Sequence, residues 1–190
     1  MHATSAFSLV LLFAASVVAD GQTCAECDAE AHGFASLNGG TTGGKDGSTV
    51  TATTLDDLVR YAASTEPLII RVDGMIKAKP FGFEVPVESH KTIIGVGAES
   101  GIQEGGLNIN SQTNVIIRNL KIHGTYDGET NWAGKEGDYD AIQIDNSTNI
   151  WIDGNHVSEP SRYSSPRPKG TTYILNTILL TVSSPRWVTV

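Results

Sequence analysis

Two stretches of this sequence repeat one another, and they decide the fold. Residues 107–123 read LNINSQTNVIIRNLKIH and residues 142–158 read IQIDNSTNIWIDGNHVS, so the second copy follows the first after 35 residues. An earlier copy, Val85-x-Val87 followed by Thr92-Ile93-Ile94, precedes the first by about 22 residues. The 35-residue shift pairs Leu107 with Ile142, Ile109 with Ile144, Thr113 with Thr148, Asn114 with Asn149, Val115 with Ile150, Ile117 with Ile152, and Ile122 with Val157.

This repeat indicates a parallel β-helix, because short β-branched strands alternate with Asn, Ser and Gly turns at a fixed period. Alternating apolar residues such as Leu107 and Ile109 then point inward and are buried when coils stack. The longer second interval predicts a loop inserted at residues 125–137. Asn114 and Asn149 are expected to form a ladder of stacked amides. A β-sandwich is the alternative, but hairpin signals are scarce.

Upstream of the repeats, the segment Thr54–Ala63 is predicted to be a helix that covers one end of the solenoid. Thr54 can cap it, Asp57 stands at the capping-box position, and apolar residues recur on one face. Without such a cap the end coil would expose apolar surface and unpaired strand edges. Residues 67–74 are then predicted to form the first full strand.

The composition limits the classes of function. The chain has 190 residues, 13 Lys and Arg against 21 Asp and Glu, and a formal charge of −8. That balance argues against a nucleic-acid protein that binds through bulk positive charge. Hydrophobic residues at 39% and charged residues at 18% are typical of a folded domain. Two cysteines cannot build a disulfide scaffold, so the core has to come from apolar packing.

The first 19 residues are predicted to be a signal peptide, and the protein is therefore expected to be secreted. Residues 1–19 carry no Asp, Glu, Lys or Arg, and small residues precede Asp20. A buried N-terminal helix is the alternative. The apolar run is too short for a comfortable membrane span, so no membrane association is expected.

Secretion affects how two further features are interpreted. Cys24 and Cys27 lie in the segment 20–32 and are expected to form a small disulfide or to pair with residues that are absent from this chain. Asn146 begins the triplet Asn-Ser-Thr, which is a valid N-glycosylation site.

Five motifs follow one another along the chain: GFASLNGGTTGG at 33–44, the helix at Thr54, IIRVDGMI at 69–76, KTIIGVG at 91–97 and NVIIRNL at 114–120. This ordered set resembles the secreted pectate lyases. The resemblance covers roughly Gly33 to Asp153 and supports a domain at residues 33–158. It implies an all-β, right-handed parallel β-helix that works as a monomer, with Ca²⁺ as cofactor and β-elimination of polygalacturonate (pectin) as its reaction.

The resemblance assigns calcium ligands to Asp138 and Asp140. Residues two apart on an extended segment project to the same side, so both carboxylates can face one groove. Calcium binds several hard oxygen ligands, and it can bridge an acidic protein and an acidic polymer. Without the resemblance, the pair would be interpreted as solvated loop carboxylates.

The resemblance then ends. Gly154 stands where the family pattern after Trp151-Ile152-Asp153 continues with His, and His156 is expected to be a turn or packing residue. Residues 159–190 form an atypical segment that lacks the expected acidic ligands and the family's arginine base. No catalytic residue is therefore assigned. Arg162 and Arg167 could replace the base, but nothing positions them.

These departures predict a truncated lyase that is weakly active or inactive. The alternative is a non-catalytic β-helical protein that binds polysaccharide. A polygalacturonase would need clustered aspartates with His and Arg-Lys motifs in later coils, and a pectin lyase would not use the calcium carboxylates. Trp132 could stack on a sugar, whereas Trp151 is expected to project from its coil and pack.

Overall fold

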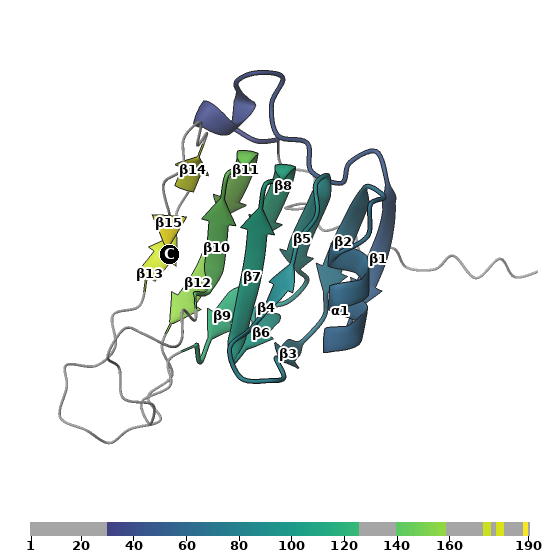
Figure 1. Ribbon diagram of the computed structural model, residues 1–190, viewed down its shortest axis with the longest axis vertical. Coiled ribbons are helices and arrows are strands. Elements are labelled where there is room, and N and C mark those ends of the chain that lie inside the picture. The colour runs from purple at the N-terminus through teal and green to yellow at the C-terminus, as the bar shows by residue number, and fades with distance from the viewer. Residues whose placement is uncertain (1–29, 126–139, 159–172, 176–177, 181–187, 190) are drawn as a thin grey trace, which may run out of the picture.

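The computed structural model describes residues 30–125 and 140–158, together with three short strands at 173–175, 178–180 and 188–189. Within these ranges the chain winds in stacked coils, and their strands form three sheets, as Figure 1 shows. Each coil passes through sheet A, then sheet B, then sheet C, and returns to sheet A beside its starting strand. This arrangement is a parallel β-helix, so the predicted fold class is confirmed.

The strands of sheet A are β1 (Ser48–Ala52), β2 (Leu68–Val72), β5 (Lys91–Gly95), β8 (Thr113–Arg118), β11 (Thr148–Asp153) and β14 (Ile178–Leu180). Those of sheet B are β3 (Met75–Lys77), β6 (Gly101–Gln103), β9 (Lys121–His123), β12 (Asn155–Ser158) and β13 (Tyr173–Leu175). Sheet C contains β4 (Phe83–Pro86), β7 (Gly105–Asn110), β10 (Ile142–Asp145) and β15 (Val188–Thr189).

The strand register confirms the 35-residue repeat. Leu107 lies opposite Ile142 in sheet C, Ile117 opposite Ile152 in sheet A, and Ile122 opposite Val157 in sheet B. The position of the inserted loop is also confirmed, because the extra residues fall between β9, which ends at His123, and β10, which begins at Ile142.

Stacked aliphatic side chains fill the interior of the solenoid. Period-two alternation sends one face of each strand inward, and the same face of the next coil lies directly above it. The central column of sheet A is buried throughout and consists of Ile70, Ile93, Ile117 and Ile152. Sheet B contributes Ile76, Ile102 and Ile122, and sheet C contributes Val85, Leu107 and Ile142.

Helix α1 (Leu55–Ala62) covers the first coil, as predicted. The backbone N–H of Asp57 donates to Oγ1 of Thr54 at 3.2 Å, and that hydroxyl donates to the Asp57 carboxylate at 2.9 Å. Leu58 and Ala62 are fully buried against the core. The prediction that residues 67–74 begin the strands was wrong, because β1 pairs in parallel with β2 and precedes it. Its sequence STVTA is short and mostly exposed, which weakens the apolar signal.

The segment from η1 (Gly33–Ser36) to Gly43 crosses the outside of sheet A. Oδ1 of Asn114 accepts the backbone N–H groups of Thr42 and Gly43 at 2.7 and 2.8 Å. Asn149, one coil later, donates to the carbonyl oxygen of Gly40 at 3.3 Å. Both asparagines have positive φ, as their equivalent corner positions require. Among the described residues, the two amides hydrogen bond to this N-terminal segment and not to one another as a ladder. The amide of Asn114 also hydrogen bonds to Nδ1 of His90, one coil earlier, at 2.9 Å.

The ends of the molecule differ from the coils between them. The last parallel strands of the three sheets, β12, β11 and β10, pair with β13, β14 and β15, and these three pairings are antiparallel. Segment 159–190 therefore does not continue the parallel coils where the structure describes it.

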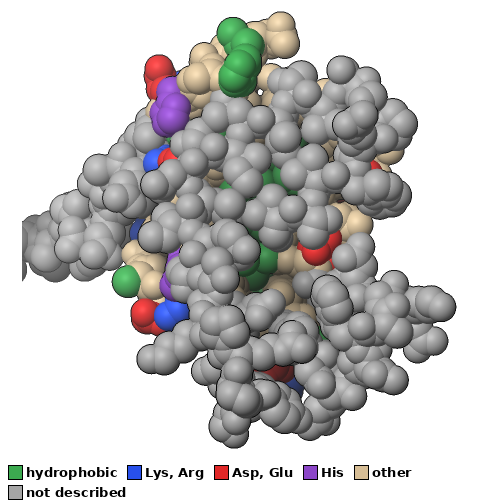
Figure 2. All heavy atoms as spheres, turned by 90° about the vertical axis from the view of Figure 1, so that its left-hand side faces the viewer, with side chains coloured by type: hydrophobic (Ala, Val, Ile, Leu, Met, Phe, Trp, Pro, Cys, Tyr) green, Lys and Arg blue, Asp and Glu red, His purple; other side chains and the backbone are tan. Residues whose placement is uncertain are grey.

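At the top of the molecule, where η1 lies in Figure 1, Figure 2 shows exposed apolar surface, and Phe34 and Leu37 are exposed there.

Candidate functional site

Asp140 lies two residues before β10, at the corner where the chain enters sheet C. Its side chain is partly buried, and Oδ2 is shielded from solvent. A Cβ atom on the neighbouring Gly106 would collide with the carbonyl oxygens of Asp140 and Ala141, so only glycine allows this approach. Asp138, the other predicted ligand, lies outside the described residues.

The donors at this corner supply part of a calcium site. Asp140 supplies hard carboxylate oxygen, which is the donor type that Ca²⁺ prefers. The part of the chain that the structure describes contains no group of three or more His, Cys, Asp or Glu residues arranged to hold a metal. Asp140 therefore fits as one ligand of a calcium ion, and the described residues do not complete the shell.

A row of polar side chains runs across the outer face of sheet C beside Asp140. Nδ2 of Asn108 donates to Oε2 of Glu84 at 3.0 Å and to Oε1 of Gln143 at 2.8 Å. The row links three successive coils, because the three residues lie on β4, β7 and β10. Sequence reasoning missed this row. The repeat itself pairs Asn108 with Gln143, so their shared outward position was the available signal.

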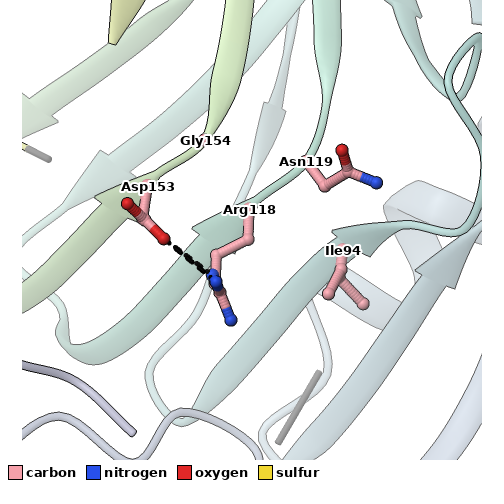
Figure 3. A pocket seen from close by; sticks show the side chains of 5 residues that line it. All are labelled: Ile94, Arg118, Asn119, Asp153 and Gly154. Carbon is pink, nitrogen blue, oxygen red and sulfur yellow. Dashed lines mark hydrogen bonds and ion pairs between the residues drawn. The ribbon is translucent and has the colours of Figure 1, made fainter. Parts of the chain in front are cut away.

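A small pocket of about 190 Å³ lies at the corner between sheets A and B, lined by Ile94, Arg118, Asn119, Asp153 and Gly154 (Figure 3). Nε and Nη2 of Arg118 donate to Oδ2 of Asp153 at 3.1 and 3.0 Å. The two side chains are only 14% and 18% exposed, so the pair is well shielded from solvent. Figure 3 shows Arg118 and Asp153 pointing toward one another.

Trp151 packs outside its coil, as predicted. It is 1% exposed and contacts Ala35 and Ile116, and the Arg118 guanidinium lies 4.7 Å from its ring centroid. The ring of His32 meets it edge-on, with 5.6 Å between centroids. These contacts give Trp151 a structural role between sheet A and the N-terminal segment.

The structure also places the residues where the family resemblance ends. Gly154 has φ 62°, and a Cβ atom there would have no neighbour within 4 Å, so the pocket is open on that side. His156 lies in β12 opposite Lys121 and is partly buried. It is a strand residue and not a turn residue, because the turn ends at Gly154.

Polar and titratable side chains also gather outside sheet B. Nζ of Lys121 donates to Glu99 at 2.6 Å, and Nζ of Lys77 donates to Glu104 at 2.8 Å. Burial, followed by the nearby Lys121 charge, lowers the pKa of His123 below its ordinary value. His123 is therefore held toward its neutral form.

Several features stay predictions. Asn146 is exposed at the corner between β10 and β11, and its glycosylation stays a prediction. No helix in the described ranges is long and apolar enough to cross a membrane. The following lie outside the described residues: the signal peptide at 1–19, Cys24, Cys27, Trp132, Arg162 and Arg167.

The sequence is similar to those of known pectate lyases. A sequence profile described as "Pectate lyase" matches residues 6–190. A pectate trisaccharide-lyase of Thermotoga maritima is 39% identical over 158 residues, which cover 80% of this chain and 42% of that protein. Its counterpart in Bacillus licheniformis is 37% identical over 150 residues, with 76% and 42% covered. The chain thus spans about two fifths of the length of these relatives.

Solved structures give the same result. A pectate lyase from a Bacillus species, crystallised with trigalacturonate, superposes with a TM-score of 0.56 at 30% identity, covering 68% of this chain and 43% of that one. A Bacillus subtilis pectate lyase mutant superposes with a TM-score of 0.59, covering 74% and 52%. At 23% identity, the second likeness supports the fold alone.

Proposed function

This chain belongs to the pectate lyase family, and from that membership we propose that it is a secreted protein that cleaves polygalacturonate by calcium-dependent β-elimination. The observation that carries the proposal is the position of Asp140. Its carboxylate lies at the edge of sheet C, beside a backbone that Gly106 leaves without a side chain. The backbone that carries Asp140 therefore packs directly on β7 at Gly106.

Charge supports a cation at this position. The chain carries a formal charge of −8 and polygalacturonate is itself an anion, so direct contact is repulsive. Asp140 and Asp138 would hold Ca²⁺, with waters and substrate oxygens completing the shell. When bound, the cation stabilises the negative charge that develops as the proton next to a uronate carboxylate is removed.

The backbone around Asp140 holds its carboxylate in a fixed orientation. Asp140 is fixed at a corner whose backbone stacks on β7, because the N–H of Leu107 donates to the carbonyl oxygen of Ala141 at 3.0 Å. A carboxylate held in this way loses little freedom when it binds a cation. The base that accepts the substrate proton is not assigned among the described residues.

The test measures the ultraviolet absorbance of the unsaturated product that polygalacturonate yields, in calcium and in excess chelator. We expect product with calcium and none with chelator. Product formation that chelator leaves unchanged would contradict the proposal. Secretion is checked separately by locating the protein and sequencing its mature N-terminus.

The second candidate is a non-catalytic protein that binds the same polymer. Among the described residues, Asp140 can bind the cation, but no base is assigned. This combination favours binding without cleavage. Calcium-dependent binding of polygalacturonate without any product would identify it. Absence of both binding and product would contradict both candidates.

A further inference from the structure

The turn that leads into the docked N-terminal segment contains the only Asn-Gly pair of the sequence, Asn38-Gly39. The N–H of Gly40 donates to the carbonyl oxygen of Leu37 at 2.9 Å, and this bond closes a β-turn around the pair. Both central residues have positive φ, 52° for Asn38 and 90° for Gly39, as in a type I′ turn. Both are exposed, so water reaches them directly.

An Asn-Gly pair can modify itself in water. The backbone nitrogen of the glycine loses its proton and attacks the side-chain carbonyl carbon of the asparagine. A new C–N bond forms, the bond to the side-chain nitrogen breaks, and that nitrogen takes up the proton and leaves as ammonia. Water then opens the five-membered succinimide at either carbonyl carbon, which gives aspartate or isoaspartate. The reaction needs no oxidant, reductant or enzyme, but it needs a backbone nitrogen that is not held in a hydrogen bond.

The backbone nitrogen of Gly39 meets this condition. Its N–H makes no hydrogen bond to any residue that the structure describes, because the turn is closed by the next N–H along the chain. A Cβ atom placed on Gly39 would meet nothing within 4 Å, so the surroundings of this residue are open. Glycine itself has no side chain that would hinder ring closure. The folded turn therefore leaves the attacking group available.

An exposed asparagine on sheet C shows the opposite arrangement. Asn110 is followed by Ser111, whose N–H donates to the carbonyl oxygen of Asp145 on the next coil at 2.8 Å. Attack by this nitrogen requires that bond to open first. The net strength of one hydrogen bond lowers the open population by about fivefold. Folding should therefore protect Asn110 and leave Asn38 reactive.

Isoaspartate at position 38 would disturb the docking of residues 40–43. It inserts one more carbon atom into the backbone between Leu37 and Gly40, so the hydrogen bond that closes the turn cannot keep its geometry. The carbonyl oxygen of Gly40 is the acceptor for Asn149 at 3.3 Å, and Asn114 accepts the N–H groups that follow. A displaced Gly40 therefore weakens the attachment of this segment to sheet A.

We propose that Asn38-Gly39 is a site of spontaneous deamidation in the folded protein, and that its isoaspartate product loosens residues 40–43 from sheet A. Water is the only co-reactant. The site is separate from Asp140 and needs no calcium, so this inference can fail while the proposed function holds, and the reverse.

The first test ages the folded protein and the urea-unfolded protein at mildly alkaline pH in water enriched in heavy oxygen, and maps the peptides by mass spectrometry. Each opened succinimide carries one heavy oxygen atom, which marks the product as formed during the incubation. Each asparagine is compared with itself, so the difference between glycine and serine as the next residue cancels. We expect Asn38 to react at nearly the same rate in both states, and Asn110 to react about fivefold more slowly when folded.

Two outcomes of this test would overturn the proposal. If folding slows Asn38 by about fivefold or more, the turn protects the pair. If folding has equal effects on Asn38 and Asn110, the hydrogen bond at Ser111 does not decide the rate.

The second test follows the docked segment by limited proteolysis near residue 42. Aged wild-type protein should be cut faster than fresh protein, whereas Asn38→Gly should be cut alike before and after ageing. Glycine accepts the positive φ and has no amide to lose, so this variant keeps the turn. Fresh Asn38→Asp has the new charge without the extra backbone atom and should be cut like fresh wild type. Slow cutting of protein that contains isoaspartate, or fast cutting of fresh Asn38→Asp, would overturn the structural effect of isoaspartate.

Discussion

Gly154 occupies in the fourth coil the corner position that Asn119 occupies in the third, and the two share left-handed φ values of 62° and 50°. Nδ2 of Asn119 donates to the carbonyl oxygen of Gly95, the equivalent position one coil earlier, at 2.7 Å. Gly154 has no side chain with which to repeat that bond to Asn119. The corner ladder therefore stops one coil short.

Gly154→Asn should consequently stabilise the protein. Asparagine tolerates a left-handed φ, a Cβ atom there meets nothing within 4 Å, and its amide can reach the carbonyl oxygen of Asn119. We expect a gain of about 1 kcal/mol in the free energy of unfolding, measured by urea titration. Gly154→Ala is the control and should lose about 1 kcal/mol, because alanine is strained at that φ. Equal effects of the two substitutions would show that the new amide does not hydrogen bond to the carbonyl oxygen of Asn119.

Asn114→Gly should release the N-terminal segment from the solenoid. Glycine accepts the φ of 60°, so the substitution removes the amide without straining the backbone. Two backbone N–H groups, of Thr42 and Gly43, then lose their acceptor, at a cost of about 1–3 kcal/mol. Urea unfolding gives the loss, and limited proteolysis should show faster cleavage near residue 42. Asn114→Asp keeps the acceptor and should lose less.

Ile117→Ala should leave a cavity in the middle of the aliphatic column of sheet A. Ile117 is fully buried between Ile93 and Ile152, and the stacked coils cannot close around the missing atoms without losing register. The expected loss is about 2–5 kcal/mol in the free energy of unfolding. Ile117→Val should lose about 0.5–1.5 kcal/mol. A loss for alanine no larger than that for valine would show that the column repacks.

Stability should fall as the pH is lowered through the titration of His123. Burial and the Lys121 charge lower its pKa in the folded protein below the ordinary value of 6.5. The fold therefore favours neutral His123, and this contribution is complete above pH 6.5 and is lost as the pH falls toward the folded pKa. The urea midpoint of the wild-type protein should therefore fall across that pH window, and in His123→Gln it should depend less on pH. Lys121→Gln should raise the pKa of His123, which NMR titration can follow, and an unchanged pKa would exclude the Lys121 contribution.

Asp140→Asn should weaken calcium binding more than about tenfold, because even residues that only support a metal ligand cost this much when lost. The amide keeps the size of the side chain but not its charge. Asp145→Asn on the same sheet face is the control, since it removes equal charge away from the corner. Calorimetric titration of calcium gives both values. Equal affinity in the two variants would remove Asp140 as a ligand.

The repeat allowed the core of the fold to be predicted from the sequence. A shift that pairs Ile117 with Ile152 constrains register strongly, because a slip by one residue would turn every inward side chain outward. The helix at Thr54 was predictable because its cap is local. β1 was missed because its exposed threonines carry little apolar pattern, and pairing with β2 alone reveals it.

The site was predictable only in part. The resemblance indicated Asp140, but the polar row depends on contacts between residues 24 and 35 positions apart, such as Glu84–Asn108 and Asn108–Gln143. Side chains that give no signal one by one come into contact when the coils stack. The antiparallel β13, β14 and β15 were not foreseen either, because pairing direction has no local signal in such short strands.

The bonds from the N-terminal segment to Asn114 and Asn149 have a consequence for the order of folding during synthesis. Thr42 bonds to a residue 72 positions later, and Gly40 to one 109 positions later. Residues 40–43 therefore leave the ribosome long before their partners exist, and they cannot dock until the third and fourth coils have emerged. Contacts of such high sequence separation form late and slowly. The first part of the chain to be made is then among the last to reach its native place, and until that step the outside of sheet A around Ile116 and Trp151 stays open to chaperones or to other nascent chains.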